Sequence, residues 1–192
     1  MGFFDRFKKK DGKLAVSPAP EKAPVPFGLA TVEIARVISG GDEAVMEEIA
    51  ACAENPKNWF EKHQERYEDR GVDSPCDLDL IAWLGLVDIL EEHGWVCERD
   101  WKDELDDFSY FLQNLHGFQQ LGLEMNADWF NADGDIPAWC GVLTEKWADR
   151  GVRVATIGID SDSYVLFPVS SAQFAALQTQ AEEIGRSIDY VD

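Results

Sequence analysis

One stretch of the sequence constrains the fold more than any other, because it predicts a helix that is apolar on almost every side. It opens at Ser74-Pro-Cys-Asp77, where the serine can cap the helix, the proline suits its first turn and the aspartate follows three residues after the cap. It runs to about His93 and carries Leu78, Leu80, Ile81, Trp83, Leu84, Leu86, Val87, Ile89 and Leu90. Such a helix belongs at the centre of a core, so other elements must cover it.

Apolar residues at helical spacing predict further helices on both sides of this stretch. The predicted ranges are 29–38, 42–53, 58–70, 100–115 and 135–150. The range 58–70 begins with a capping-box pair, Asn58 and Glu61. Two short strands are predicted at 95–97 and 121–125.

The hydrophobic period changes near the C-terminus. The runs 152–159 and 164–169 alternate like strands, and a turn-forming Asp-Ser-Asp-Ser sequence joins them, which predicts a hairpin. A capping-box pair at Ser170 and Gln173 opens a last helix, and 187–191 predicts a final edge strand. Helices come first and strands late, without regular alternation. The sequence therefore predicts an α+β fold, with a helical N-terminal half packed on a small, mostly antiparallel sheet from the C-terminal half.

Charge divides the chain into two parts. Residues 1–26 hold six bases and three acids, a net charge of +3, and the remaining 11 bases and 34 acids give 27–192 a net charge of −23. The boundary falls in a Pro/Ala-rich segment, which disfavours helix and sheet. We expect 1–26 to be a basic tip and a flexible linker, and 27–192 to be a single acidic α+β domain. The tip carries Phe3, Phe4 and Phe7, and we favour a simple leader over a membrane or partner anchor.

The acidity narrows the classes of ligand. Acids outnumber bases 37 to 17 in the whole chain, whereas nucleic-acid binding depends on Lys and Arg that neutralise phosphates. Stable association with an anionic membrane is disfavoured for the same reason. The apolar runs are too short to span a bilayer, and the basic tip lacks the apolar core of a signal peptide. We therefore expect a cytoplasmic protein that binds neither nucleic acid nor membrane.

The loop 126–135 resembles a calcium-binding loop only superficially. When Gly134 is placed at the sixth position of an EF-hand loop, the first and twelfth positions are Trp129 and Cys140. Both positions require acidic ligands. We therefore interpret this loop as the polar lead-in to the next helix.

Other metal and catalytic patterns are also missing from the sequence. The four cysteines, Cys52, Cys76, Cys97 and Cys140, show no zinc-binding spacing and are expected to be mostly buried thiols. His93 and His116 each precede a glycine, as histidines at helix C-termini often do. No nucleophile elbow or phosphate-binding loop occurs. We predict no catalytic residue, no cofactor and no metal ligand.

The most distinctive surface predicted from the sequence lies on the helix 100–115. Its apolar stripe is formed by Trp101, Leu105, Phe108, Leu112 and Leu115, and the opposite face is strongly acidic. Some of these acids suit the positive end of the helix dipole. A field of one sign also speeds association with an oppositely charged partner. The predicted partner-binding residues are Asp100, Trp101, Asp103, Glu104, Asp106 and Asp107.

Three stretches, 80–94, 100–108 and 160–169, resemble a bacterial family, domain-of-unknown-function family 6630. The resemblance covers about Asp77 to Asp189 and implies no catalytic residues. More loosely, a strand that ends in aspartate, a turn, and a tyrosine-containing strand followed by a helix resemble small acidic immunity proteins. That second resemblance implies a cytoplasmic, non-enzymatic protein that binds a toxin.

These observations favour a non-enzymatic, cytoplasmic protein-binding domain, in particular an immunity-type inhibitor of a basic toxin or effector. Two alternatives stay open. The first is an enzyme, or a metal- or ligand-binding domain, whose site is assembled from dispersed acids and histidines. The second is a housekeeping domain whose acidity serves only solubility.

Overall fold

A computed structural model describes residues 26–191, so the predicted tip and linker lie outside the described residues except for Pro26. The helices in this range are α1 (Phe27–Ile38), α2 (Glu43–Glu54), α3 (Pro56–Lys62), α4 (Gln64–Asp69), α5 (Leu78–Glu92), α6 (Leu105–Asn114), α7 (His116–Gln120), α8 (Ile136–Lys146) and α9 (Ser171–Glu183). The strands are β1 (Cys97–Asp100), β2 (Val152–Ile157), β3 (Ser163–Ser170) and β4 (Ile188–Tyr190).

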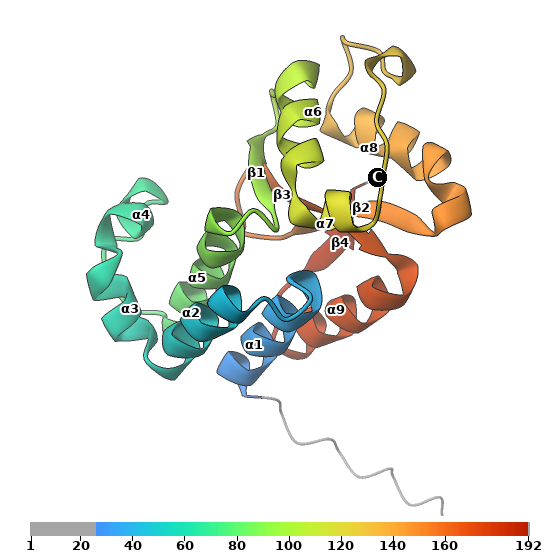
Figure 1. Cartoon of the computed structure of the whole chain (residues 1–192). Helices are drawn as coiled ribbons and strands as arrows, with labels where there is room; N and C mark the ends of the chain where they lie inside the picture. The colour runs from blue at the N-terminus through green and yellow to red at the C-terminus, as the bar shows by residue number, and fades with distance from the viewer. Residues whose placement is uncertain (1–25, 192) are drawn as a thin grey trace, which may run out of the picture.

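The fold is α+β, as predicted, with one antiparallel sheet between two helical layers (Figure 1). The strand order is β1-β3-β2-β4, which confirms the hairpin and the late edge strand. Side chains alternate along β3: Val165 and Phe167 pack with α1, α2, α5 and α9, whereas Leu166 packs with α6, α7 and α8. The second helical layer therefore covers the face of the sheet that the N-terminal helices leave open.

Helix α5 lies at the centre of the first layer, as its composition predicts. Every residue from Ile81 to Leu90 is buried. Gly85 is required there, because a Cβ atom at this position would lie 2.6 Å from the Cys52 Sγ. The predicted cap is wrong: Asp77, not Ser74, accepts the Leu80 N–H at 3.0 Å, so the helix begins three residues later.

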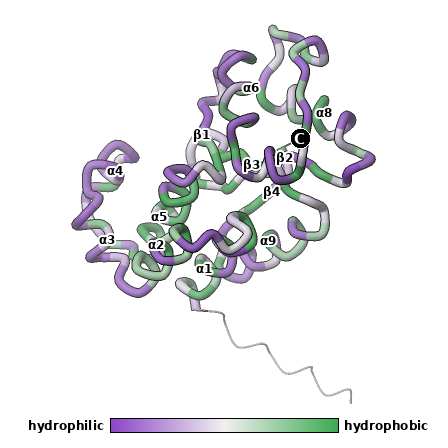
Figure 2. Tube along the Cα trace, in the orientation of Figure 1, coloured by the Kyte–Doolittle hydropathy of each residue, from purple (hydrophilic) through white to green (hydrophobic). Residues whose placement is uncertain are grey.

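The predicted helix 58–70 is two short helices, α3 and α4, separated at His63. The capping-box prediction at Asn58 is wrong, because the side chain of Asn55 accepts the Asn58 N–H at 3.1 Å and starts α3 earlier. Helix α4 is held to α5 by Tyr67, whose hydroxyl donates to the Ile81 carbonyl at 3.0 Å. Figure 2 shows the contrast between the largely hydrophilic α4 and the hydrophobic residues of α5.

The predicted helix 100–115 also begins later than expected. Residue Asp100 ends β1, and its side chain accepts the Lys102 N–H at 2.8 Å, which forms a turn before α6 starts at Leu105. The strand predicted at 95–97 is found at 97–100, and the strand predicted at 121–125 is absent from the described structure. His116 opens α7 instead of ending a helix, because Leu115 is extended between α6 and α7.

The predicted helix starts in the last third of the chain are confirmed. Asp135 accepts the Ala138 N–H at 2.9 Å and caps α8. Ser170 accepts the Gln173 N–H and caps α9, as the capping-box pattern predicts, whereas the Gln173 side chain accepts from the Ser170 hydroxyl at 2.7 Å.

Candidate functional site

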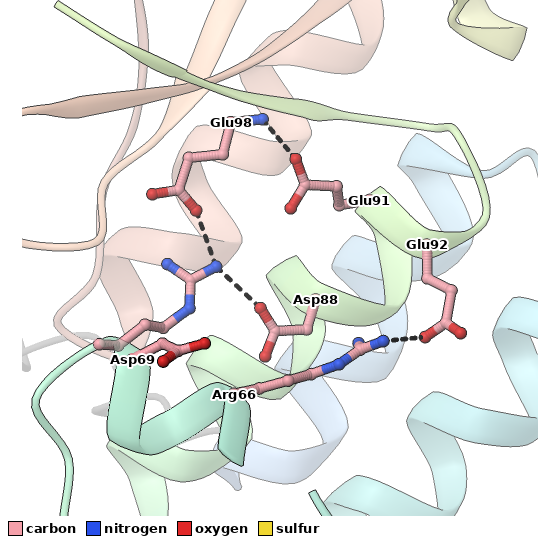
Figure 3. Close-up of a pocket in the computed structure, with 7 residues that line it drawn as sticks. Arg66, Asp69, Asp88, Glu91, Glu92 and Glu98 are labelled. Carbon is pink, nitrogen blue, oxygen red and sulfur yellow. Dashed lines mark hydrogen bonds and ion pairs between the residues drawn. The ribbon is translucent and has the colours of Figure 1, made fainter.

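A surface pocket of about 470 Å³ lies where α4, α5 and β1 meet (Figure 3). Its lining is entirely ionisable, and we call it the Arg70 cluster: Arg66, Asp69, Arg70, Asp88, Glu91, Glu92 and Glu98. The sequence patterns did not predict this cluster. Its one signal in the sequence is Asp88, a charged residue inside the apolar run of α5.

Arg70 connects the three elements. Its Nη2 atom donates to the Asp88 Oδ1 at 2.8 Å and to the Glu98 Oε2 at 2.7 Å. At one end of the pocket, Arg66 bonds Glu92 at 2.9 Å. Glu91 accepts the backbone N–H of Glu98 at 2.8 Å. These contacts tie the end of α4 to α5 and to β1.

Burial and ion pairing have opposing effects on the pKa values of the Arg70 cluster. It raises the pKa of Asp88, which is 8% exposed, although Arg70 opposes the rise. It also raises the pKa of Glu91. For Arg70, burial acts to lower the pKa, but Asp88 and Glu98 outweigh burial and raise it. The guanidinium therefore stays charged and compensates two carboxylates.

The groups beneath this pocket are not activated nucleophiles. Burial, together with the charge of Asp88, raises the pKa of the Cys52 thiol to about 12. Burial also raises the pKa of the Tyr67 hydroxyl. The thiolate is the reactive form of cysteine, so Cys52 is unreactive at neutral pH. The contacts of the Arg70 cluster hold the fold together, and neither Cys52 nor Tyr67 is an activated nucleophile.

A second region, around the start of α6, has the opposite character. The described residues include five large hydrophobic side chains that are exposed, and three of them, Trp101, Tyr110 and Phe111, lie within eleven consecutive residues. Exposed acids lie among them. We define the α6 surface as Asp100, Trp101, Glu104, Asp106, Asp107, Tyr110 and Phe111, all of which are exposed.

Five of the six predicted partner-binding residues belong to the α6 surface. The exception is Asp103, whose side chain is 9% exposed and accepts two bonds from Arg99, one of them from Nη2 at 3.0 Å. The Arg99 guanidinium also lies 3.8 Å from the centre of the Phe111 ring. Asp103 therefore fixes Arg99 and is not available to a partner.

The aromatic side chains of the α6 surface could be predicted only in part. Trp101 was expected on the buried stripe, but the turn after β1 leaves it 49% exposed. Tyr110 and Phe111 lie outside that stripe, and this was the signal for their exposure. The two aromatic rings contact each other edge to face, with centroids 5.3 Å apart.

Two hollows border α6, and the segment 123–135 contributes to both. The acidic hollow, about 460 Å³, lies at the start of α6 and is lined by Trp101, Lys102, Asp103, Glu104, Ala132, Asp133, Gly134, Asp135, Pro137 and Tyr164. The apolar hollow, about 540 Å³, lies at the other end and is lined by Gln113, Phe118, Leu123, Glu124, Met125, Asn126, Ala127 and Trp129. The fold thus brings together two acidic stretches that the sequence analysis treated separately.

The histidines and cysteines are dispersed. His63 stacks on Trp59 with ring centroids 4.2 Å apart, His93 bonds Glu48 at 3.2 Å, and His116 packs against Trp95. None of them lines the Arg70 pocket. Three of the cysteines are buried and Cys76 is exposed. Among the described residues, no group of three or more His, Cys, Asp or Glu side chains could hold a metal ion.

Sequence comparison places the chain in a family. The model for a domain of unknown function, DUF6630, matches residues 30–191. The chain belongs to the DUF6630 family. The match includes α2, α3 and α4, which precede the stretches on which the resemblance rests. Both the Arg70 cluster and the α6 surface fall inside it.

The family description states no activity, so the role of each residue in this DUF6630 domain has to come from its geometry. No curated protein and no solved structure matches the chain. In the part of the chain that the structure describes, no helix is both long and apolar enough to cross a membrane.

Proposed function

We propose that this DUF6630 domain is a non-enzymatic protein-binding domain that recognises a basic partner through the α6 surface. One observation carries the proposal: three of the five exposed large hydrophobic side chains in the described range gather within residues 101–111, among exposed acids. Large exposed aromatic side chains are the residues that most often dominate the energy of protein interfaces.

The charges at the α6 surface suit a basic partner. Within residues 26–191, its four acids form none of the ion pairs, whereas Asp103 just behind them is paired with Arg99. The cation beside them, Lys102, lies over the Trp101 ring at 4.7 Å. Two helix N-termini, those of α6 and α8, reduce the negative potential only partly, because each is equivalent to about half a charge. The charge of −23 over residues 27–192 adds a long-range attraction, which raises association rates with basic proteins.

Within this proposal, the partner is a basic toxin or effector, and the domain acts in the cytoplasm as an immunity-type inhibitor. The support is the combination of strong acidity with an exposed aromatic patch on a rigid helix. Inhibition then follows from occlusion, because a partner that docks on α6 has its own basic surface covered.

The test uses a partner identified by affinity capture from the native host and a pair of variants matched in charge. Glu104→Gln/Asp106→Asn/Asp107→Asn neutralises the α6 surface, and Glu43→Gln/Glu47→Gln/Glu54→Gln removes the same charge from exposed positions on α2. At low salt, stopped-flow measurements should show association slowed by about tenfold for the α6 variant and by about twofold or less for the α2 variant. Equal rates for the two variants would show that the α6 surface is not the binding surface.

A further inference from the structure

A cavity of about 480 Å³ borders the Arg70 cluster and has a different lining. It shares Asp69, Arg70 and Glu98 with the pocket of that cluster. The rest of its lining comes from α5, the segment after α4 and the turn between β2 and β3, and includes Val72, Leu80, Leu84, Ile159 and Asp160. Its volume lies within the range of about 300–1,000 Å³ that is usual for small-molecule sites.

The apolar side of this cavity is a part of the core that the fold leaves uncovered. Leu84 is buried in a small core cluster, against which Val72, Leu80 and Ile159 pack. These three side chains are only half-buried, so each keeps apolar surface in contact with water. Leu80 and Leu84 lie one turn apart on α5 and therefore face the same way. An apolar group that covers this surface removes it from water, which favours binding.

The polar side of the cavity has more carboxylates than cations. Among the described residues that line it, Arg70 is the only cation, and its Nη2 atom already bonds both Asp88 and Glu98. The other arginine of the Arg70 cluster, Arg66, is paired with Glu92. One guanidinium group therefore compensates two carboxylates beside the cavity.

Two further acids line the cavity at the surface of the molecule. Asp69 is the last residue of α4 and forms none of the ion pairs within residues 26–191. Asp160 has a long contact of 3.9 Å with Arg186, which lies outside the lining of the cavity. The negative charge around the cavity is thus compensated only in part, so that a cationic ligand is attracted and an anionic ligand is repelled.

We propose that this cavity binds a small organic cation, namely an amine with one apolar group. The ammonium group lies on the side of the carboxylates, and the apolar group covers Val72, Leu80 and Leu84. A hydrated metal ion would satisfy the charge but leave the apolar side in water. The proposal concerns a different part of the molecule from the α6 surface and does not rest on it.

The test uses the full isotope-labelled chain in NMR titrations with three probes. Phenethylamine has a ring and a positive charge, phenethyl alcohol has the ring without the charge, and ethylamine has the charge without the ring. Physiological salt screens non-specific attraction to the acidic protein. Phenethylamine should bind at least about fivefold more tightly than either of the other probes, because it alone contacts both sides of the cavity. Its chemical-shift changes should centre on residues 69–84 and 159–163.

Two double variants with the same change in charge locate the site. Asp69→Asn/Asp160→Asn removes two carboxylates that line the cavity, and Asp73→Asn/Asp162→Asn removes two exposed neighbours outside its lining. Asparagine suits position 160, where φ is 57°, because its short polar side chain tolerates the left-handed region. The first variant should weaken phenethylamine binding by about fivefold, and the second by about twofold or less.

A third variant tests the apolar side of the cavity. Val72→Thr keeps the shape of the side chain and replaces one methyl group with a hydroxyl group. It should weaken phenethylamine binding by about threefold and leave ethylamine binding unchanged. Urea denaturation of all three variants shows that each is still folded.

Four results would each overturn the proposal. The first is the absence of any chemical-shift change with phenethylamine. The second is equal binding of phenethylamine and phenethyl alcohol, since the ligand would then need no charge. The third is equal binding of phenethylamine and ethylamine, since the apolar side would then be unused. The fourth is an equal loss of phenethylamine binding in the two double variants, since attraction to the whole acidic surface would then explain it.

Discussion

The Arg70 cluster and the α6 surface are both rich in carboxylates, yet the molecule uses them in opposite ways. In the Arg70 cluster, guanidinium groups from α4 contact the carboxylates of α5 and β1, and the central ion pair is largely buried. On the α6 surface the acids face solvent among exposed aromatic rings. The difference shows that carboxylates of this domain are buried where the fold supplies their cation and remain exposed to solvent where it does not.

The buried ion pair of the Arg70 cluster has an energetic cost, which makes it sensitive to the arrangement of the helices. Removing Asp88 from water is unfavourable, and its attraction to Arg70 offsets that cost only while the geometry is kept. The pair therefore selects one arrangement of α4 against α5. No such constraint applies to Asp106 or Asp107, which keep their hydration.

The largest predicted effect is a loss of stability when the central arginine of the Arg70 cluster is removed. Arg70→Ala leaves the buried Asp88 carboxylate without its ion-pair partner, so the free energy of unfolding should fall by about 3 kcal/mol or more. Arg36→Ala removes an exposed arginine whose contact with Glu33 is 3.4 Å long, and should change stability by about 0.5 kcal/mol or less. Urea denaturation of both variants measures the difference. A small loss for Arg70→Ala would place the cluster among ordinary surface ion pairs.

A second, smaller effect tests the boundary of the α6 surface. Asp103→Asn weakens a partly buried, two-bond contact with Arg99, so stability should fall by about 1.5–3 kcal/mol. Asp106→Asn, three residues further along, should cost at most about 1 kcal/mol through the helix dipole. Urea denaturation of the Asp103→Asn and Asp106→Asn variants measures the difference in their free energies of unfolding. If both substitutions cost equally little, Asp103 belongs with the exposed acids after all.

The smallest predicted effect concerns pH. Because burial raises the pKa of Asp88 above its ordinary value of 3.8, the folded state binds more protons than the unfolded state between those two pKa values. The contribution of Asp88 to the free energy of unfolding should therefore fall as pH rises from about 3.8 through the raised pKa. Asp88→Asn removes this contribution, so its stability should decline less over that window than the wild type. Asp106→Asn retains Asp88 and should follow the wild-type decline.

The sequence predicted the elements whose signals are periodic and local. The burial of α5 follows from apolar residues on all its sides, and the C-terminal hairpin from alternation and turn residues. The starts of helices were predicted less accurately, because several polar residues near each start can serve as the N-cap. Asp77 caps α5 in place of Ser74, and the turn at Asp100 delays α6 until Leu105.

The candidate sites depend on contacts that no local pattern carries. Arg70 meets Asp88 and Glu98 from positions eighteen and twenty-eight residues away, which only the packing of α4 on α5 and β1 brings about. The acids at 100–107 were predicted as a surface, but their neighbours Asp133 and Asp135 join them only through the fold. Tertiary structure decides which acids are paired and which are displayed.

The bond from the Glu98 N–H to Glu91 has a consequence for the protein at high concentration. Strand β1 is an edge of the sheet, and exposed edges template aggregation when their N–H and C=O groups are free to pair with another chain. Here the side chain of Glu91 occupies the Glu98 donor, and the Asp103 N–H occupies the Asp100 carbonyl at 3.0 Å. Two hydrogen-bonding groups of this edge are thus occupied by the chain itself, which leaves fewer of them free to pair with the strand of another molecule.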